Sequence, residues 1–195
     1  MTTRDRILDE TLTLFAEYGY DGTSVEAIAE RVGIKAPSLY NHFKGKEDIL
    51  NALIDMAEAR YEEFFGSDRQ IGRLPESKEE FIQAAMRRVS FTMSDPMIRK
   101  MRKFLVREQF RNERFAEITT KHQLDGVRNM YASIIKGMMD KGLFKKDDPE
   151  LLSTEVTAAV ALLISKADRQ PRSEQESMES IERHIRHFCD VYMIG

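Results

Sequence analysis

The chain has 195 residues, enough to bury a hydrophobic core without disulfides or metals, and its single cysteine, Cys189, excludes an intrachain disulfide and fits a reducing compartment. Its 30 Lys and Arg against 33 Asp and Glu give a net charge of −3, which argues against a polybasic nucleic-acid-binding chain. The N-terminus MTTRDRILDE shows no signal-peptide core, and the most apolar run, 156–164, is too short to span a membrane, so we expect a cytoplasmic protein with no membrane contact.

A first helix is predicted from about Arg4 to Tyr18, with Gly19 closing it. Its predicted apolar face carries Leu8, Thr11, Leu12, Phe15 and Tyr18. We expect this helix to pack against the next two and complete a three-helix head.

The segment from Thr23 to Lys46, TSVEAIAERVGIKAPSLYNHFKGK, predicts two short helices joined by a tight turn. Apolar residues of the first helix recur at i, i+3, i+4 and i+7, at Val25, Ile28, Ala29 and Val32. Thr23 is the predicted N-cap, and Glu26, three residues later, completes a capping box. Gly33 then turns the chain without the steric cost of a Cβ atom.

The second helix is predicted to begin at Ala36-Pro37, because a proline at the first helical position loses no intrahelical hydrogen bond. It should bury Leu39 and Phe43 and leave the polar side chains around them outward. These outward residues are Lys35, Ser38, Tyr40, Asn41 and His42. A short exposed helix that carries donors, acceptors and a ring suits the major groove of double-stranded DNA.

The charge distribution partly offsets the acidic total. Between residues 24 and 46 four basic residues face two acidic ones, a balance of 4 − 2 = +2. Arg4 and Arg6, in the first helix, are expected to add to the same basic surface. An acidic remainder discourages non-specific binding, so we expect a modest salt dependence of DNA affinity.

The rest of the chain also shows helical periodicity and no convincing strand pattern. A fourth helix is predicted from near Lys46, and the two glycines and the proline of 66–75 predict a loop. The later helices are expected to begin at the capping box Ser77–Glu80, at Pro96, near Asn112, at Asp148-Pro149 and at the capping box Ser173–Glu176, with ends near Met93, Arg111 and Gly142 for the first three. The predicted fold is therefore all-α, with about nine helices.

The order of residues in the first fifty positions resembles the TetR family of transcriptional regulators. The matching positions are Thr23, Ile28-Ala29, Val32-Gly33, Leu39-Tyr40, His42-Phe43 and Lys46-Glu47. One departure is Pro37, where many members carry glycine. The resemblance implies a helix-turn-helix DNA-binding head over 1–48 and a body over 49–195 that binds an effector and dimerises.

The resemblance also implies which residues meet DNA, with His42 at a DNA-contacting position of the family. The expected contact set is Thr23, Ser24, Lys35, Ala36, Pro37, Ser38, Tyr40, Asn41, His42 and Lys46. Lys35 and Lys46 should mainly meet phosphates, and Ser38, Asn41 and His42 should meet base edges. The expected activity is that of a repressor released from a palindromic operator by a small molecule. The alternative is a helical interaction protein of the same fold that has lost DNA binding.

The body is rich in methionine and phenylalanine, and the chain has 11 of each. For any one residue core filling is the simpler interpretation, but together they resemble the body of a TetR-like regulator, where central helices enclose a small effector. An apolar or amphipathic effector is expected to contact Phe64, Met86, Met101, Phe104, Gln109, Phe110, His122 and Tyr131.

The last two helices each carry apolar stripes long enough for a four-helix bundle across a two-fold axis. The residues assigned to this homodimer interface are Val156, Ala159, Val160, Leu163, Ile181, Ile185, Phe188 and Tyr192. The alternative is that both helices only close the monomer core, and the TetR resemblance favours the dimer.

No catalytic grouping is apparent, so we expect no enzyme activity and no cofactor. His184 and His187 lie near Cys189 and Asp190, but Arg183 and Arg186 are interleaved and no second ligand cluster is visible. We therefore expect no metal site.

Overall fold

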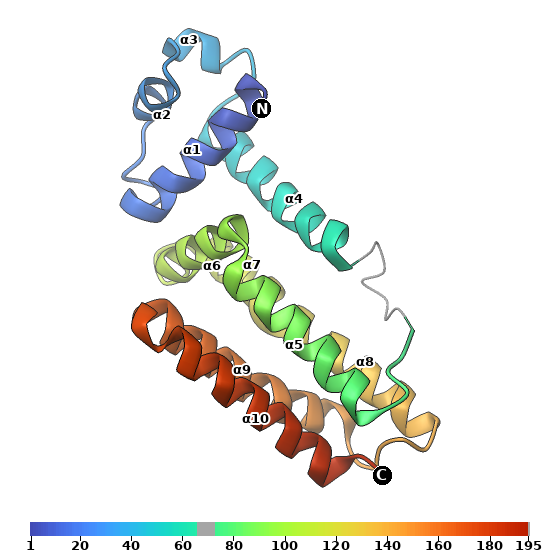
Figure 1. The fold of residues 1–195 in the computed structure, drawn as a ribbon. Helices are drawn as coiled ribbons and strands as arrows, with labels where there is room; N and C mark the ends of the chain where they lie inside the picture. Colours follow the sequence, from blue (N-terminus) through green and yellow to red (C-terminus); the bar gives the residue numbers. More distant parts are fainter. Residues whose placement is uncertain (66–72, 195) are drawn as a thin grey trace. The chain divides into compact units, whose positions relative to one another are not determined.

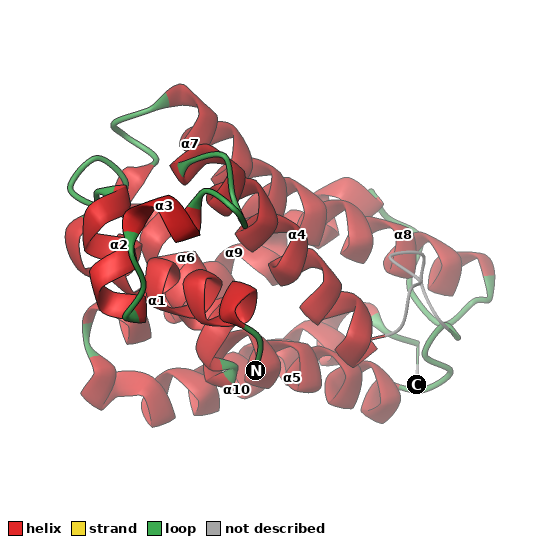
Figure 2. Ribbon diagram, turned by 90° about the horizontal axis from the view of Figure 1, so that it is seen from above, coloured by secondary structure: helices red, strands yellow, loops and turns green. Residues whose placement is uncertain are grey.

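The computed structural model describes residues 1–65 and 73–194. These residues form helices and no β-strand, apart from an isolated bridge between Phe144 and Met193 (Figure 2). No helix among them combines the length and the apolar character needed to cross a bilayer. The all-α prediction is confirmed, whereas residues 66–72 of the predicted loop lie outside the described residues.

The helices follow one another along the chain as α1 (Thr3–Tyr18), α2 (Val25–Val32), α3 (Ala36–Leu39), α4 (Lys46–Phe65), α5 (Lys78–Ser94), α6 (Pro96–Glu108), α7 (Glu113–Thr119), the π-helical segment η1 (Thr120–Asp125), α8 (Gly126–Asp140), α9 (Pro149–Arg169), the 3₁₀ turn η2 (Pro171–Ser173) and α10 (Glu174–Tyr192). Because α7, η1 and α8 run on without a break, they correspond to the single helix predicted from Asn112, and the described residues agree with the nine predicted helices.

The contacts divide the chain into two compact units. The described residues of unit 1 are 1–65 and 96–119, and those of unit 2 are 73–95 and 120–194. Unit 1 therefore contains α1–α4 with α6 and α7, whereas the predicted division placed everything after residue 48 in the body. The boundary between the two packed units therefore differs from the predicted functional division after residue 48. The functional roles assigned to 1–48 and 49–195 remain predictions.

Unit 1 is built around a cluster of four aromatic rings. Phe15 of α1 stacks on Phe104 of α6, with ring centroids 5.1 Å apart, and Phe104 meets Phe115 of α7 edge-on at 5.4 Å. Tyr20 closes the cluster, 5.2 Å from Phe15 and 5.5 Å from Phe115. These rings explain why α6 and α7 belong to the same unit as the N-terminal helices.

Unit 2 packs α9 against α8 and α10, and α10 against α5 (Figure 1). Its core also centres on aromatic rings, with Phe81 of α5 beside Tyr131, Phe144 and Phe188. Gly142 ends α8 in the left-handed region, at φ 74°, and the chain turns there toward α9, as the sequence predicts.

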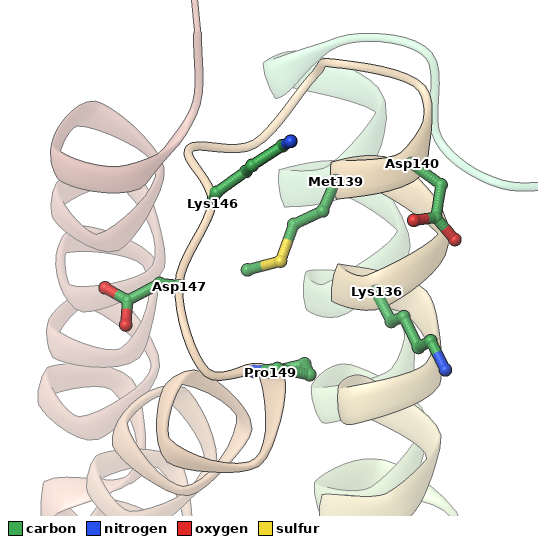
Figure 3. A pocket seen from close by; sticks show the side chains of 6 residues that line it. All are labelled: Lys136, Met139, Asp140, Lys146, Asp147 and Pro149. Atoms are coloured by element: carbon green, nitrogen blue, oxygen red, sulfur yellow. The ribbon is translucent and has the colours of Figure 1, made fainter.

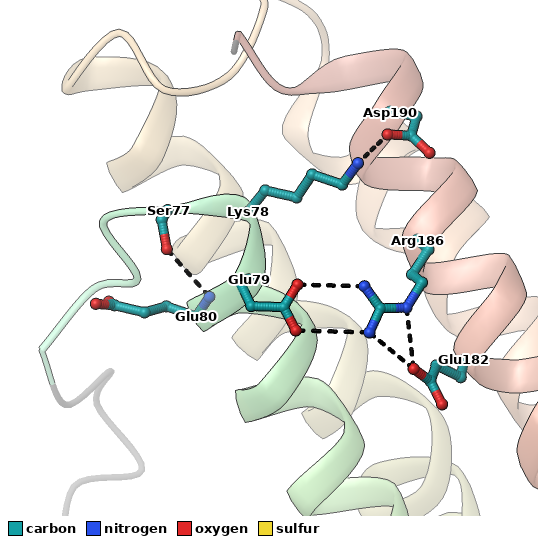
Figure 4. A network of polar contacts seen from close by, with 7 residues as sticks. All are labelled: Ser77, Lys78, Glu79, Glu80, Glu182, Arg186 and Asp190. Atoms are coloured by element: carbon teal, nitrogen blue, oxygen red, sulfur yellow. Dashed lines mark hydrogen bonds and ion pairs between the residues drawn. The ribbon is translucent and has the colours of Figure 1, made fainter.

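The capping contacts of α2, α5 and α10 differ from the predicted ones. Ser24, not Thr23, caps α2, because the Thr23 hydroxyl donates to the carbonyl of Gly19 while the Ser24 hydroxyl accepts from the amide of Ala27. Ser77 caps α5 as predicted, and its hydroxyl accepts from the amide of Glu80 (Figure 4). The carboxylate of Glu80, however, accepts from the amide of Glu76 rather than from that of Ser77.

Ser173 precedes α10 without the predicted capping box. Its hydroxyl donates to the carbonyl of Gln170, and so it does not cap the helix through its side chain. Two other boundaries also differ, since α6 ends at Glu108 rather than near Arg111, and the helix predicted from Asn112 contains the π-helical segment η1.

Candidate DNA-binding interface

The α2–turn–α3 segment forms a helix-turn-helix within unit 1 (Figure 1). Gly33 adopts the left-handed conformation, at φ 75°, and its amide donates to the carbonyls of Ala29 and Glu30 at the end of α2. The chain then enters α3, a single turn with Pro37 near its start and no side-chain cap. Leu39 and Phe43 are buried as predicted, and they anchor α3 to the rest of unit 1.

One edge of α3 is exposed in the way the sequence predicts. Tyr40 has 55% of its surface exposed, and Asn41 and His42 are also exposed in the turn that follows the helix. Of the other expected contact residues, Ser24, Lys35 and Pro37 are exposed, and Ala36, Ser38 and Lys46 are half-buried. The surface around α3 therefore presents an amide, an imidazole and a phenol to a partner.

Thr23 does not share this surface. Its exposed fraction is 1%, and its hydroxyl donates to the carbonyl of Gly19 at 2.8 Å. The side chain is committed to the turn between α1 and α2, so DNA could not reach it without a rearrangement. The sequence signal was ambiguous, because Thr23 and Ser24 are both residue types that cap helices.

The basic residues near α3 differ in how far they are already engaged. Lys46 donates to the carbonyl of Tyr20 at 2.7 Å, and its ammonium lies 4.6 Å from the centre of the Tyr20 ring. Arg31 forms an ion pair with Glu10 of α1 at 2.9 Å. Within the described residues, the side chains of Lys35 and Lys44 have no hydrogen bond or ion pair.

Two arginines of α1 also contact the helix-turn-helix rather than projecting away from it. The guanidinium of Arg6 donates to the carbonyl of Val32, the last residue of α2, at 2.6 Å. The guanidinium of Arg4 lies 4.9 Å from the centre of the Phe43 ring, just after α3. The expectation that both arginines simply add positive potential did not anticipate these contacts.

Polar contacts from α6 and α7 further fix the N-terminal helices, and no sequence motif signalled them. Lys100 donates to Thr13 of α1 at 2.9 Å, and Arg107 donates to the carbonyl of Glu17, in the last turn of α1, at 2.8 Å. Arg114 donates to Glu47, at the start of α4, at 2.8 Å and also to Asn51. The position of α3 therefore depends on a unit larger than the first 48 residues.

The residues expected to line an effector pocket are distributed over both units. Met101 and Phe104 are buried in the core of unit 1, where Phe104 has no exposed surface, whereas Phe110 is 91% exposed and Phe64 is 55% exposed. Gln109 donates its amide to the carbonyl of Val106.

The remaining three pocket residues belong to unit 2. Tyr131 lies in its core, where burial raises the pKa of the phenol to about 12, and Met86 packs against that core. His122 is half-buried in η1. Neither unit by itself gathers the eight residues around one cavity.

A surface hollow of about 350 Å³ lies within unit 2 between α8 and the segment before α9 (Figure 3). Met139 and Pro149 supply its apolar surface, and Figure 3 shows the Met139 side chain directed into the space between them. The other lining residues, Lys136, Asp140, Lys146 and Asp147, are exposed. Such a charged and open lining differs from the mostly apolar, enclosed sites that bury small ligands.

Four of the residues assigned to a dimer interface are part of the protomer's own core. Val156, Ile181, Ile185 and Phe188 are at most 2% exposed, so they offer no surface to a second copy. Ala159, Val160 and Leu163 are half-buried, and the hydroxyl of Tyr192 donates to Glu155 at 2.9 Å. The alternative interpretation, that the last two helices close the core of the monomer, accounts for these four buried side chains.

The segment around His184 carries structural contacts rather than a ligand cluster. Asp190 pairs with Lys78, and Arg186 bridges Glu79 and Glu182 at 3.2 and 2.8 Å, so α10 is held to α5 (Figure 4). Cys189 is buried, and burial raises the pKa of its thiol to about 12. No group of three or more metal-ligating residues occurs in the described part of the chain.

Comparison with known proteins bears on the same N-terminal segment. Residues 7–53 match the family model described as bacterial regulatory proteins, tetR family. A biofilm-operon HTH-type negative transcriptional regulator, IcaR of Staphylococcus epidermidis, is 44% identical over 52 residues, which are 27% of this chain and 28% of that protein. The chain thus spans little more than a quarter of the length of this relative.

Solved structures match over the whole chain at low sequence identity. The complex of SmeT with triclosan superposes with a TM-score of 0.79 and 18% identity, covering 100% of this chain and 93% of SmeT, the repressor of a Stenotrophomonas maltophilia multidrug efflux pump. A transcriptional regulator of Aquifex aeolicus superposes with a TM-score of 0.74 and 19% identity, covering 95% of this chain and 99% of that one. These similarities establish a common fold.

Proposed function

The chain belongs to the TetR family of DNA-binding transcriptional regulators, and we propose that it represses transcription by binding a palindromic operator as a homodimer. The observation that carries this proposal is the exposed edge of α3. Tyr40, Asn41 and His42 are exposed at the C-terminal end of α3 and in the turn after it, and their neighbours Leu39 and Phe43 are buried. Asparagine is well suited to bind adenine through two hydrogen bonds in the major groove.

The proposed dimer uses a different face of α9 from the one first assigned. Leu151 and Leu162 are 59% and 68% exposed, and Ala158 is exposed between them. Positions i, i+7 and i+11 lie on one side of a helix, so these residues form an apolar row on α9 that nothing within unit 2 covers. Homodimers are typical of the TetR family, and a two-fold axis would bring this row against the same row of a second copy.

We further propose that a small apolar or amphipathic effector releases the operator. The SmeT–triclosan complex supports this proposal, since it is a ligand complex of a protein with the same fold. An effector that binds better to the DNA-incompetent state shifts the population away from the operator. Such a ligand should raise the melting temperature of the protein and weaken operator binding by about 1–3 kcal/mol.

Selection from a random pool of duplexes, with the full-length wild-type chain, tests the function directly. A TetR-like dimer should enrich inverted half-sites whose centres lie roughly 34–36 Å apart, or a multiple of that distance. The selected duplex then serves as the probe for a ligand panel. Enrichment of no sequence would contradict operator binding, and a panel that shifts neither melting temperature nor affinity would contradict effector release.

Lys35→Ala is expected to reduce the salt dependence of DNA affinity more than Lys46→Ala. Lys35 is exposed and has no side-chain partner within the described residues, so its ammonium can meet a phosphate at no internal cost. Lys46 would have to leave the carbonyl of Tyr20. Losing one phosphate contact should lower the slope of log affinity against log salt by about 0.9. Titrations at several salt concentrations measure this slope, and equal slopes for Lys35→Ala and wild type would contradict the phosphate role.

A further inference from the structure

The segment proposed to read DNA, which is α3 with the turns before and after it, contains too little helix to hold its own position. Helix α3 is a single turn, Ala36–Leu39, without a side-chain cap, and isolated turns of helix are unstable in water. Leu39 and Phe43 anchor one side by burial. The geometry of the turn before α3 must then be set by what fixes the end of α2.

The last carbonyls of α2 are satisfied from two sources. The amides of Gly33 and Ile34 donate to Ala29 and Glu30, within the turn itself. The carbonyl of Val32 instead receives the guanidinium of Arg6, which reaches across from α1. This charge-assisted bond is also favourable because the carbonyl end of a helix attracts positive charge.

Arg4 contacts the chain just after α3, at Phe43. Its guanidinium lies over the ring of Phe43, at 4.9 Å from the centroid, and Phe43 is itself 3% exposed. The two arginines are two residues apart on α1. One turn of α1 therefore contacts the chain both before α3, at Val32, and after α3, at Phe43. We propose that Arg6 is a positioning residue, which sets the orientation of α3 for base recognition instead of neutralising a phosphate.

This inference rests on the proposed DNA binding. The effects of Arg6→Ala distinguish a positioning role of Arg6 from a phosphate contact. A phosphate contact acts on all sequences equally, whereas orientation of α3 matters only where bases are read. The probes are the duplex selected by the wild-type chain and a scrambled duplex of the same composition, both titrated with full-length protein at about 50 mM salt, where non-specific binding is measurable.

For Arg6→Ala we expect affinity for the selected duplex to fall about tenfold, as for one lost charge-assisted contact, with affinity for the scrambled duplex and the salt slope unchanged. Lys35→Ala is the matched control, because it should weaken both duplexes and lower the slope. Arg6→Lys keeps a positively charged donor on a shorter, more flexible side chain, so its affinity for the selected duplex should lie between those of wild type and Arg6→Ala.

A second readout needs no DNA. Loss of the Val32 contact should speed amide hydrogen exchange at Gly33 and Ile34, while the amide of Gly19, at the far end of α1, should keep its wild-type rate. This measurement shows whether the turn has loosened locally in a protein that is otherwise folded.

Equal weakening of both duplexes with a slope lowered by about 0.9 would overturn the inference in favour of a phosphate contact. Unchanged affinity for both duplexes, or unchanged exchange at Gly33 and Ile34, would also overturn it. If Arg6→Ala failed to fold, wild-type affinity of Arg6→Lys for the selected duplex would be the contradicting result. A wild-type chain that selects no sequence would overturn the proposed function and this inference together.

Discussion

Phe104→Ala is expected to lower the free energy of unfolding by about 3–5 kcal/mol. The ring has no exposed surface and packs between Phe15 and Phe115, so its removal leaves a cavity in the core of unit 1. Urea denaturation of the full-length chain measures the loss as a lower midpoint. Since Phe15 belongs to α1, DNA affinity should fall as well at temperatures where the variant begins to unfold.

Phe110→Ala provides the matched control, since it removes the same side chain six residues later. At 91% exposure the ring makes little contact, and we expect a change within about 0.5 kcal/mol. Equal destabilisation by the two substitutions would contradict the burial on which the aromatic cluster of unit 1 depends. If effector response were lost in Phe110→Ala alone, its assignment to the pocket would gain support.

Leu162→Arg is expected to convert the protein to monomers without unfolding it. The side chain is 68% exposed in the protomer, so the charge costs little there, but at a two-fold interface each copy would bury an unpaired guanidinium at a penalty of several kcal/mol. Sedimentation analysis should show the monomer mass, and affinity for a two-half-site duplex should fall sharply although α2 and α3 are unchanged.

Phe188→Arg should behave differently, and the contrast tests where the interface lies. Phe188 is 2% exposed and packs against Phe81, Phe144 and Tyr192, so a charge there is buried inside the protomer and should unfold unit 2. Circular dichroism would report this loss of helix. A folded, dimeric Leu162→Arg protein would contradict the interface on α9, and a folded, monomeric Phe188→Arg protein would restore the original assignment.

The helices could be predicted from the sequence because apolar periodicity and proline or glycine punctuation are local signals. Pro96 and Pro149 both mark first helical positions, and Gly33 and Gly142 both adopt positive φ where helices end. Cap identity was less predictable, since the adjacent hydroxyls of Thr23 and Ser24 compete and the Thr23 hydroxyl donates instead to the carbonyl of Gly19. The π-helical turn of η1 has no such local signature and could not be predicted.

The exposed edge of α3 could be anticipated because its neighbours Leu39 and Phe43 define the buried side. What the sequence could not indicate is which basic residues remain available to DNA. Arg6 and Lys46 are engaged by backbone carbonyls of Val32 and Tyr20, each 26 residues away in the chain. Long-range polar contacts of this kind leave no periodic pattern.

Burial in the body shows the same limitation. An apolar stripe predicts that a helix face is covered, but not by what covers it. Phe104 and Phe188 both lie in the cores of their own units, whereas Leu162 of α9, which was not assigned to the interface, is exposed. The packing boundary was missed for the same reason, because the rings that join α6 and α7 to α1 are distant in sequence.

The central claim is that the exposed edge of α3 reads bases, and binding-site selection with Asn41→Ala beside wild type tests it most directly. Asn41 is exposed at this edge, and loss of a bidentate contact to a base should cost about 1–3 kcal/mol of discrimination at one position. The variant should therefore enrich half-sites with unchanged spacing and symmetry but no preference at one base pair in each. Identical motifs from Asn41→Ala and wild type would contradict base recognition by this residue and place the reading surface elsewhere.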